Sequence, residues 1–302
     1  MAKEIHVIEE YVYNYSAANK PSKKVNLGDT VILKTKDCFT NQITSEEQLV
    51  TTIDFNHVNP ATGPVYVNGA EPGDLLVVDI VDIKIADQGV TCSLPGVGPL
   101  HDQVETRTRI LPIKDGIATF NDITFPVDPM IGVIGVAPKE GEFPSGHPGD
   151  HGGNLDNKKI TAGARLYFPV HHPGALFQCG DLHANMGDGE IIGTGIEIAG
   201  EVIVTFQLIK QIPKERPILE TDDYWYTIAP APDYPTALKR ASEDMQQLLV
   251  DAYGWDKTDA GLYMSLQGDV EICQACTPCE LDLIVRFGVP KRADKPLLPR
   301  VE

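Results

Sequence analysis

The stretch Leu75–Ile85 reads LLVVDIVDIKI, a long run rich in valine and isoleucine. Residues of this kind favour a strand over a helix. Shorter apolar runs follow at Arg165–Val170, Val202–Ile209 and Leu281–Phe287, with glycine, proline and asparagine between them. Many short strands separated by turns are typical of a sandwich, a jelly roll or a barrel. The sequence therefore predicts a mainly β fold, similar to a β-sandwich or jelly roll.

The pattern of apolar residues changes near the C-terminal end of the chain. Across Thr236–Val250 they recur at helical spacing, and charged residues lie off that stripe. This predicts an amphipathic helix whose apolar stripe packs on the core. A second, shorter helix is expected over Thr258–Leu266. We expect a single domain over residues 1–302 with a helical segment at 236–266; two β-rich subdomains are the alternative, although no linker divides them convincingly.

Amino-acid composition limits the binding partners and the cellular location that we expect for this protein. The chain has 302 residues, with 43 acidic and 25 basic side chains and a net charge of −18. This charge repels phosphate backbones and anionic membranes, so nucleic acid and membranes are excluded as expected partners. No apolar run approaches the roughly 20 residues of a membrane span. The first ten residues do not resemble a signal peptide, so we expect a cytoplasmic protein with its cysteines as thiols.

The stretch Gly180–Glu190, GDLHANMGDGE, concentrates acids around one histidine. Apolar runs flank it on both sides, which indicates two strands meeting at a polar turn. Side chains two apart on a strand point to the same face, so Asp181 and His183 can converge on one point. Hard oxygen donors beside an imidazole suit a divalent metal. The alternative is a solvated hairpin tip, where Asp, Asn and Gly are common.

Other polar loops could complete a metal site. Asp54 stands just before a bend rich in proline and glycine, where it either caps a turn or serves as a ligand. His101 follows a Gly/Pro-rich loop, and His151 lies in Lys139–Asn157, the longest segment that lacks a strand or helix pattern. A loop of that length in a compact chain is usually functional or disordered. Mixed carboxylate and imidazole ligands predict catalytic zinc, whereas an oxygen-only subset would suit calcium, also as a second ion.

Three cysteines, Cys273, Cys276 and Cys279, have the spacing of part of a metal motif. No fourth cysteine or histidine lies nearby in the sequence, and structural zinc generally needs four ligands. We therefore favour simple packing for this cluster over metal binding.

Several motifs resemble those of the acetamidase/formamidase family, in the order in which that family has them. They are Asn59–Pro64, Gly69–Asp74, Gly152–Asp156, Gly180–Ala184 and Gly187–Glu190. The resemblance runs from about Val25 to Cys279. It implies a β-rich fold, a metal-dependent active site, and a cytoplasmic homodimer or higher homo-oligomer.

The resemblance also implies roles for individual residues. Metal and site roles transfer to Asp181 and His183, then to Glu190, to Asp156 and Asn154, and to Asp54. The metal-ligand roles of His101 and His151 are inferred mainly from the polar loops in which they lie. We expect Asn154 and Asp156 to bind substrate, and Glu190, with Asp188 beside it, to supply the catalytic acid.

The implied reaction is hydrolysis of the C–N bond of a short linear amide, such as formamide or acetamide, to a carboxylate and ammonia. A divalent ion, by expectation zinc, would activate water, and Glu190 would serve as general base and then general acid. A small neutral amide also fits the strongly negative chain. Two alternatives stay open: a non-catalytic calcium-binding β-sandwich, and a hydrolase of another small or cyclic amide.

Overall fold

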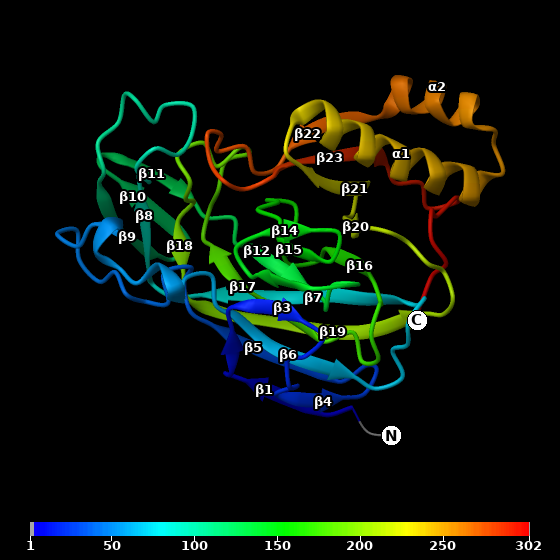
Figure 1. The fold of residues 1–302 in the computed structure, drawn as a ribbon, viewed down its shortest axis with the longest axis horizontal. Helices are drawn as coiled ribbons and strands as arrows, with labels where there is room; N and C mark the ends of the chain where they lie inside the picture. The colour runs from blue at the N-terminus through cyan, green and yellow to red at the C-terminus, as the bar shows by residue number, and fades with distance from the viewer. Residues whose placement is uncertain (1–2, 302) are drawn as a thin grey trace.

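A computed structural model describes residues 3–301, and two large sheets form its body (Figure 1). The first sheet runs in the order β1 (Ile5–Ile8), β5 (Thr30–Thr35), β19 (Gly200–Ile209), β7 (Leu75–Ile85), β16 (Arg165–Pro169), β20 (Ile218–Glu220), β21 (Tyr224–Ala231), β23 (Leu283–Pro290) and β22 (Asp269–Ile272). Its strand pairs are antiparallel except for the parallel pair β1–β5.

The second sheet runs in the order β11 (Ile123–Pro126), β10 (Ile117–Phe120), β9 (Thr108–Lys114), β8 (Gln88–Cys92), β18 (Glu197–Ile198), β17 (Phe177–His183), β12 (Met130–Gly135), β15 (Gly152–Asn154) and β14 (Pro148–Gly149). The strand β6 (Ala61–Val67) also pairs with β17, and with β2 (Tyr11–Val12) and β4 (Lys23–Val25). A small separate ribbon joins β3 (Asn14–Ser16) to β13 (Glu142–Pro144).

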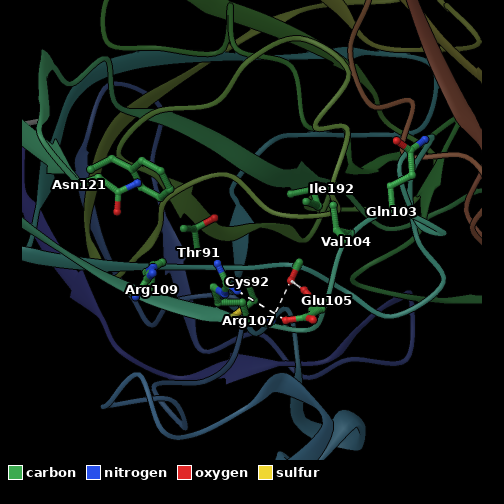
Figure 2. A pocket seen from close by; sticks show the side chains of 11 residues that line it. Thr91, Cys92, Gln103, Val104, Glu105, Arg107, Arg109, Asn121 and Ile192 are labelled. Atoms are coloured by element: carbon green, nitrogen blue, oxygen red, sulfur yellow. Dashed lines mark hydrogen bonds and ion pairs between the residues drawn. The ribbon is translucent and has the colours of Figure 1, made fainter.

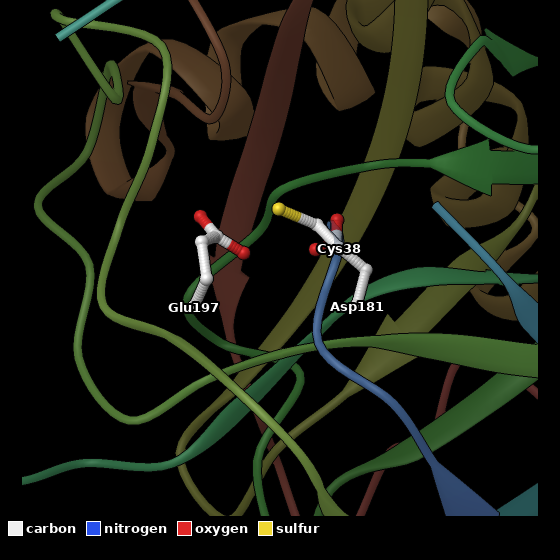
Figure 3. Close-up of side chains that lie close together, drawn as sticks. All are labelled: Cys38, Asp181 and Glu197. Atoms are coloured by element: carbon white, nitrogen blue, oxygen red, sulfur yellow. The ribbon is translucent and has the colours of Figure 1, made fainter. Parts of the chain in front are cut away.

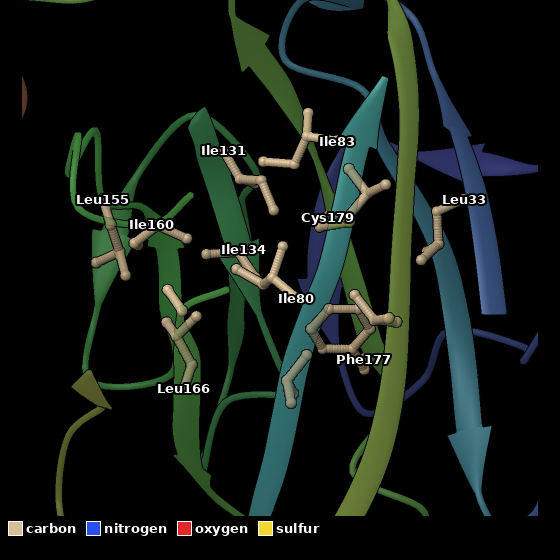
Figure 4. Packing of buried hydrophobic residues seen from close by; sticks show 14 of the residues in the cluster. Leu33, Ile80, Ile83, Ile131, Ile134, Leu155, Ile160, Leu166, Phe177 and Cys179 are labelled. Carbon is tan, nitrogen blue, oxygen red and sulfur yellow. The ribbon is translucent and has the colours of Figure 1, made fainter. Parts of the chain in front are cut away.

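The first part of β7, Leu75–Val78, is buried on both faces, which explains its four consecutive apolar residues. Leu76, Val78 and Ile80 belong to the main core, between the two sheets. Figure 4 shows this core, with side chains of the second sheet meeting those of the first. Leu75 and Val77 point to the other face, into a second core beneath the helices. The prediction of a mainly β, sandwich-like fold is confirmed.

Two helices cover the far face of the first sheet. They are α1 (Tyr234–Tyr253) and α2 (Lys257–Gln267), which lie side by side over the β21–β23 end of the sheet (Figure 1). The carboxylate of Asp233 caps the start of α1, and Gly254 ends it in a left-handed conformation. Ala241, Met245 and Leu248 on its apolar stripe are buried, so the predicted pair of C-terminal helices is confirmed.

The segment Lys139–Asn157 differs from its expected lack of regular structure, because β13, β14 and β15 lie within it. These strands are only two or three residues long, and several of their residues are glycine or proline, so they leave little periodic pattern in the sequence. Two short 3-10 turns, η1 (Val50–Thr52) and η2 (Phe55–His57), interrupt the polar segment before β6. Among residues 3–301, no helix is both long and apolar enough to cross a membrane.

Candidate active site

Three neighbouring strands of the second sheet place the acids of the two central motifs. Strand β12 lies between β15 and β17, and its pairing sets Gly132 opposite Asp181. The chain leaving β15 returns to the same glycine, since the amide of Leu155 donates to the carbonyl of Gly132 (2.9 Å). A Cβ on Gly132 would lie 2.6 Å from a carboxylate oxygen of Asp156 and 2.6 Å from one of Asp181. Both carboxylates therefore rest on a glycine surface where only hydrogen fits.

The next strand pair joins a histidine to a buried glutamate. Antiparallel pairing of β17 with β18 sets His183 opposite Glu197. Nε2 of His183 lies 3.1 Å from a carboxylate oxygen of Glu197 and 3.4 Å from one of Asp181. The backbone of Gly195 lies close to the other side of the imidazole ring, where a Cβ would be 2.9 Å from Nδ1. The imidazole is thus fixed between two acids that come from different strands.

A C-terminal segment holds the third part of the site. The carbonyl of Cys273 accepts from the amide of Gly189 (2.6 Å), and Gly189 and Gln274 form a parallel bridge. This contact places Glu190 next to Asp156. The carboxylate oxygens of Glu190 and Asp156 nearest to His183 lie 3.9 and 4.0 Å from its Nε2.

Three of these acids have a left-handed backbone. The φ angles of Asp156, Asp181 and Glu190 are +36°, +55° and +43°. Non-glycine residues adopt this region rarely, at a cost of about 1–3 kcal/mol each, and such residues concentrate at functional sites. The strain therefore falls on the acids that converge on one imidazole.

The acids line a cavity of about 360 Å³. Besides the acids and His183, its walls come from distant parts of the chain: the segments around Cys38, from Phe55 to Asn59, around Leu94, around His147 and Asn154, from Gly193 to Glu197, and from Gln274 to Leu281. Apolar side chains form much of the rim, namely Phe39, Phe55, Val58, Leu94, Val97 and Leu281. A cavity with an apolar rim and a few convergent polar groups is the usual form of a small-molecule site.

Burial dominates the electrostatics of this cluster. It raises the pKa of Glu197 to about 8 and raises the pKa of Glu190. Burial, followed by the charges of Glu190 and Asp181, raises the pKa of Asp156 well above its usual range. Burial alone would lower the pKa of His183, but the carboxylates of Glu197 and Asp181 raise it above its usual value. Four buried carboxylates thus share a single imidazole as their adjacent positive group.

This arrangement fits a bound cation. One oxygen each of Asp156, Asp181 and Glu197, together with Nδ1 of His183, is buried and has no hydrogen-bond partner within residues 3–301. Unpaired buried charge is costly, and a metal ion relieves it. The residues form two groups, and within each group the potential ligand atoms lie within 4.8 Å of one another. One group is Cys38, Asp181 and Glu197, shown in Figure 3, and the other is Asp156, His183 and Glu190. Thiol, imidazole and carboxylate donors together suit zinc better than calcium.

Two of the expected ligands lie elsewhere. Asp54 is exposed and caps η2, accepting from the amide of Asn56 (2.9 Å) and lying 2.6 Å from Nδ1 of His57. The capping interpretation of Asp54 therefore describes its place in the fold. His101 is exposed, with Nδ1 3.0 Å from the carbonyl of Gly98.

His151 is buried beside the site, in a neighbouring cavity. Its ring packs edge-on against Tyr15, with centroids 4.8 Å apart, and against Phe143. Burial lowers its pKa to about 4. A different histidine of the same loop, His147, lines the cavity of the acid cluster together with Asn154. Asn154 is buried, and its Oδ1 lacks a hydrogen-bond partner among residues 3–301.

Asp188 faces away from the acid cluster. Its two carboxylate oxygens accept from the guanidinium of Arg286 at 2.9 and 2.8 Å, and Lys158 lies 2.9 Å away. Arg286 is fully buried and also binds Glu271 and Asn157. The structure thus gives Asp188 a place in an ion-pair network that anchors the end of the motif.

Sequence reasoning overlooked Cys38, Glu197 and Gln274. A signal was present for Glu197, a lone acid between Ile196 and Ile198 in an apolar strand. Cys38 and Gln274 offered no comparable pattern, because their partners in the site lie more than 80 residues away in sequence.

The three cysteines Cys273, Cys276 and Cys279 lie near the cavity but have two different environments. Cys276 and Cys279 line the cavity, with their sulfur atoms 3.5 Å apart. Cys273 is buried against the guanidinium of Arg286. All six cysteines of the chain are free thiols.

A larger cavity, of about 580 Å³, lies beside β8 and β9 (Figure 2). Ile192 lines this cavity, and the next residues, Gly193 and Thr194, line the acid cavity, so one short segment separates the two. Its arginines, Arg107 and Arg109, are paired with glutamates and largely exposed.

The chain is similar in sequence to a known family of proteins. Residues 9–147 and 144–247 match the model of the acetamidase/formamidase family. The formamidase of Methylophilus methylotrophus is 30% identical over 247 residues, which cover 62% of this chain and 61% of that protein. The acetamidase of Mycolicibacterium smegmatis is 28% identical, over 53% of this chain and 56% of its own length. The chain therefore matches about three fifths of the length of these curated relatives.

Solved structures extend the similarity to nearly the whole chain. The crystal structure of an acetamidase from Bacillus halodurans is 41% identical, with a TM-score of 0.91, and the match covers 94% of this chain and 97% of that one. A gamma lactamase from Delftia acidovorans is 22% identical with a TM-score of 0.65, a likeness of fold alone. On the family match and the similarity to the Bacillus halodurans structure, this chain belongs to the acetamidase/formamidase family.

Proposed function

We propose that this protein is a metal-dependent hydrolase that cleaves the C–N bond of a short linear amide to a carboxylate and ammonia. Family membership supports the reaction class. The observation that carries the metal dependence is the buried cluster of four acids, Asp156, Asp181, Glu190 and Glu197, around Nε2 of His183 in one cavity. One oxygen each of Asp156, Asp181 and Glu197 has no hydrogen-bond partner within residues 3–301.

The chain's own residues divide into two groups in this proposal. Asp181, His183 and Glu197, with the thiol of Cys38 beside them, would hold a divalent ion, by expectation zinc. Such an ion polarises a carbonyl and lowers the pKa of water.

The second group, Asp156 and Glu190, would handle protons. Burial raises the pKa of both carboxyls, and the two lie side by side, so a proton on one can be shared with the other. Glu190 takes a proton from the attacking water onto its carboxylate and passes it to the leaving nitrogen. In this proposal the Asp156 carboxyl would share the proton of Glu190, while the substrate-binding role expected from the sequence stays a prediction.

The shape and polarity of the cavity favour a small neutral substrate. Apolar side chains at the rim, such as Phe39 and Leu94, favour an uncharged molecule. The unpaired Oδ1 of buried Asn154 offers a hydrogen-bond acceptor inside. Formamide and acetamide are the simplest molecules of this kind. The homo-oligomeric state and the cytoplasmic location stay predictions.

The test is ammonia release from a panel of amides, with metal analysis of the same sample. We expect turnover of formamide or acetamide by protein that contains zinc. Calcium alone with no turnover of any amide would favour the alternative of a calcium-binding module. Turnover of a cyclic amide such as a lactam, with none of the linear amides, would replace the substrate class and keep the reaction type.

A further inference from the structure

Gln274 is a buried side chain of the cavity whose role the proton and metal groups do not explain. It follows β22, and its main chain is held on two sides: the amide of Ile284 donates to its carbonyl (3.1 Å), and Gly189 bridges to it in parallel. It lines the acid cavity and is 3% exposed.

The amide nitrogen of Gln274 faces the proton-handling pair. Nε2 donates to a carboxylate oxygen of Asp156 at 2.7 Å and to one of Glu190 at 3.4 Å. An amide nitrogen carries two hydrogens and accepts none, so it can give one hydrogen to each carboxyl. Gln274 thereby holds the two carboxyls at a fixed separation.

The carbonyl oxygen of the same side-chain amide lacks a hydrogen-bond partner among the described residues. Oε1 of Gln274 is buried and finds no hydrogen-bond partner within residues 3–301. A buried acceptor without a partner costs about 1–3 kcal/mol, so such a group is usually completed by something outside the chain. A molecule that enters this cavity and carries an N–H donor would complete it.

We propose that Gln274 is a specificity-determining residue: its Oε1 accepts a hydrogen bond from the N–H of the substrate amide while its NH₂ group positions Asp156 and Glu190. This rests on the proposed amide hydrolysis. The arrangement selects substrates with at least one N–H. An ester has an oxygen with lone pairs and an alkyl group where a primary amide has two hydrogens, so it leaves Oε1 unpaired and adds repulsion.

The experiment compares acetamide with methyl acetate in two variants that separate the ends of the Gln274 side chain. Gln274→Met removes both the acceptor and the donor at similar length, whereas Gln274→Glu keeps an oxygen acceptor and removes the donor. Ester binding is followed as competitive inhibition where ester turnover is too slow to measure. Metal content and circular dichroism are recorded for every protein.

In Gln274→Met we expect the ratio of amide to ester kcat/KM, or of the corresponding affinities, to fall by about 10- to 100-fold, the range for an unpaired buried polar group. In Gln274→Glu we expect a loss of kcat shared by both substrates, with the ratio within threefold of wild type. Thr277→Ser, at an exposed position of the same segment outside the cavity lining, is the matched control and should change neither quantity by more than threefold.

A ratio within threefold of wild type in a folded, metal-containing Gln274→Met protein would overturn the specificity role. If Gln274→Met fails to fold, Gln274→Glu decides both roles. Because it keeps the acceptor, a change of more than threefold in the amide-to-ester ratio would overturn the specificity role, and unchanged rates on both substrates would overturn the positioning role. A wild-type protein that releases no ammonia from any amide contradicts the proposed function itself, so the two failures can be told apart.

Discussion

The two neighbouring cavities of this protein differ in what they bury. The larger, about 580 Å³, is lined by arginines that are paired with glutamates and reach solvent. The smaller, about 360 Å³, contains four buried acids, three of which have one oxygen without a hydrogen-bond partner within residues 3–301. Consecutive residues line the two cavities: Ser93 and Ile192 line the larger, and Leu94 and Gly193 line the smaller.

The volume of a cavity therefore does not by itself identify a functional site. An exposed ion pair contributes little energy, and its charges are already satisfied. Buried carboxylates without partners are costly and persist where a ligand completes them. Three acids with left-handed backbone, Asp156, Asp181 and Glu190, line the smaller cavity. The larger cavity has Asn121 in this region, a residue type that adopts it more readily. The following predictions test whether the difference is functional, beginning with the largest effect.

Replacing Glu190 with Gln should reduce kcat by about two to four orders of magnitude, the usual contribution of general acid–base catalysis. The amide keeps the size of the side chain and removes its ability to carry a proton. The measurement is steady-state ammonia release at saturating acetamide, with metal content checked in parallel. A loss under threefold would remove Glu190 from this role.

Replacing Gly132 with Ala should lower kcat/KM by about 100-fold, because the added methyl group would meet carboxylate oxygens of Asp156 and Asp181 at 2.6 Å. Gly187→Ala is the matched control: a Cβ there meets no described atom within 4 Å. Equal activity in the two variants would show that the placement of these acids is unimportant.

Replacing Asp188 with Asn should affect stability more than catalysis. The change weakens a bidentate ion pair with the fully buried Arg286, at an expected cost of about 2 kcal/mol in the free energy of unfolding. Urea unfolding measures this cost, with the exposed Asp122→Asn as control. A tenfold loss of kcat in a stable protein would instead restore Asp188 to the catalytic role expected from the sequence.

The smallest effect is expected in the larger cavity. Arg107→Ala combined with Arg109→Ala should change kcat/KM for acetamide by less than threefold, since both arginines only form largely exposed ion pairs with Glu105 and Glu46. Steady-state kinetics of the double variant tests this, with salt held constant. A tenfold change would mean that the larger cavity takes part in the reaction.

The fold was predictable where periodicity is strong. The apolar run of β7 and the helical stripe of α1 are local properties of the chain, so both elements were expected from sequence. The short strands around Gly152 were missed, because two or three residues with several glycines have no measurable period.

The site was predictable only in part. Asp181 and His183 lie two apart on one strand, so their convergence follows from strand geometry. Glu197 depends on the register of β17 with β18, and Cys38 depends on contacts across the whole chain. Asp54 shows the converse problem, since a capping acid and a ligand look alike in a polar loop.

The central claim is that the buried acids around His183 hold a divalent ion needed for amide hydrolysis. The most direct measurement is metal content and ammonia release from one sample before chelation, after exhaustive chelation, and after zinc is restored. We expect at least one ion per chain before chelation. Metal content and ammonia release should be lost together on chelation and should recover together when zinc is restored. Full-rate amide hydrolysis by metal-free protein would contradict it.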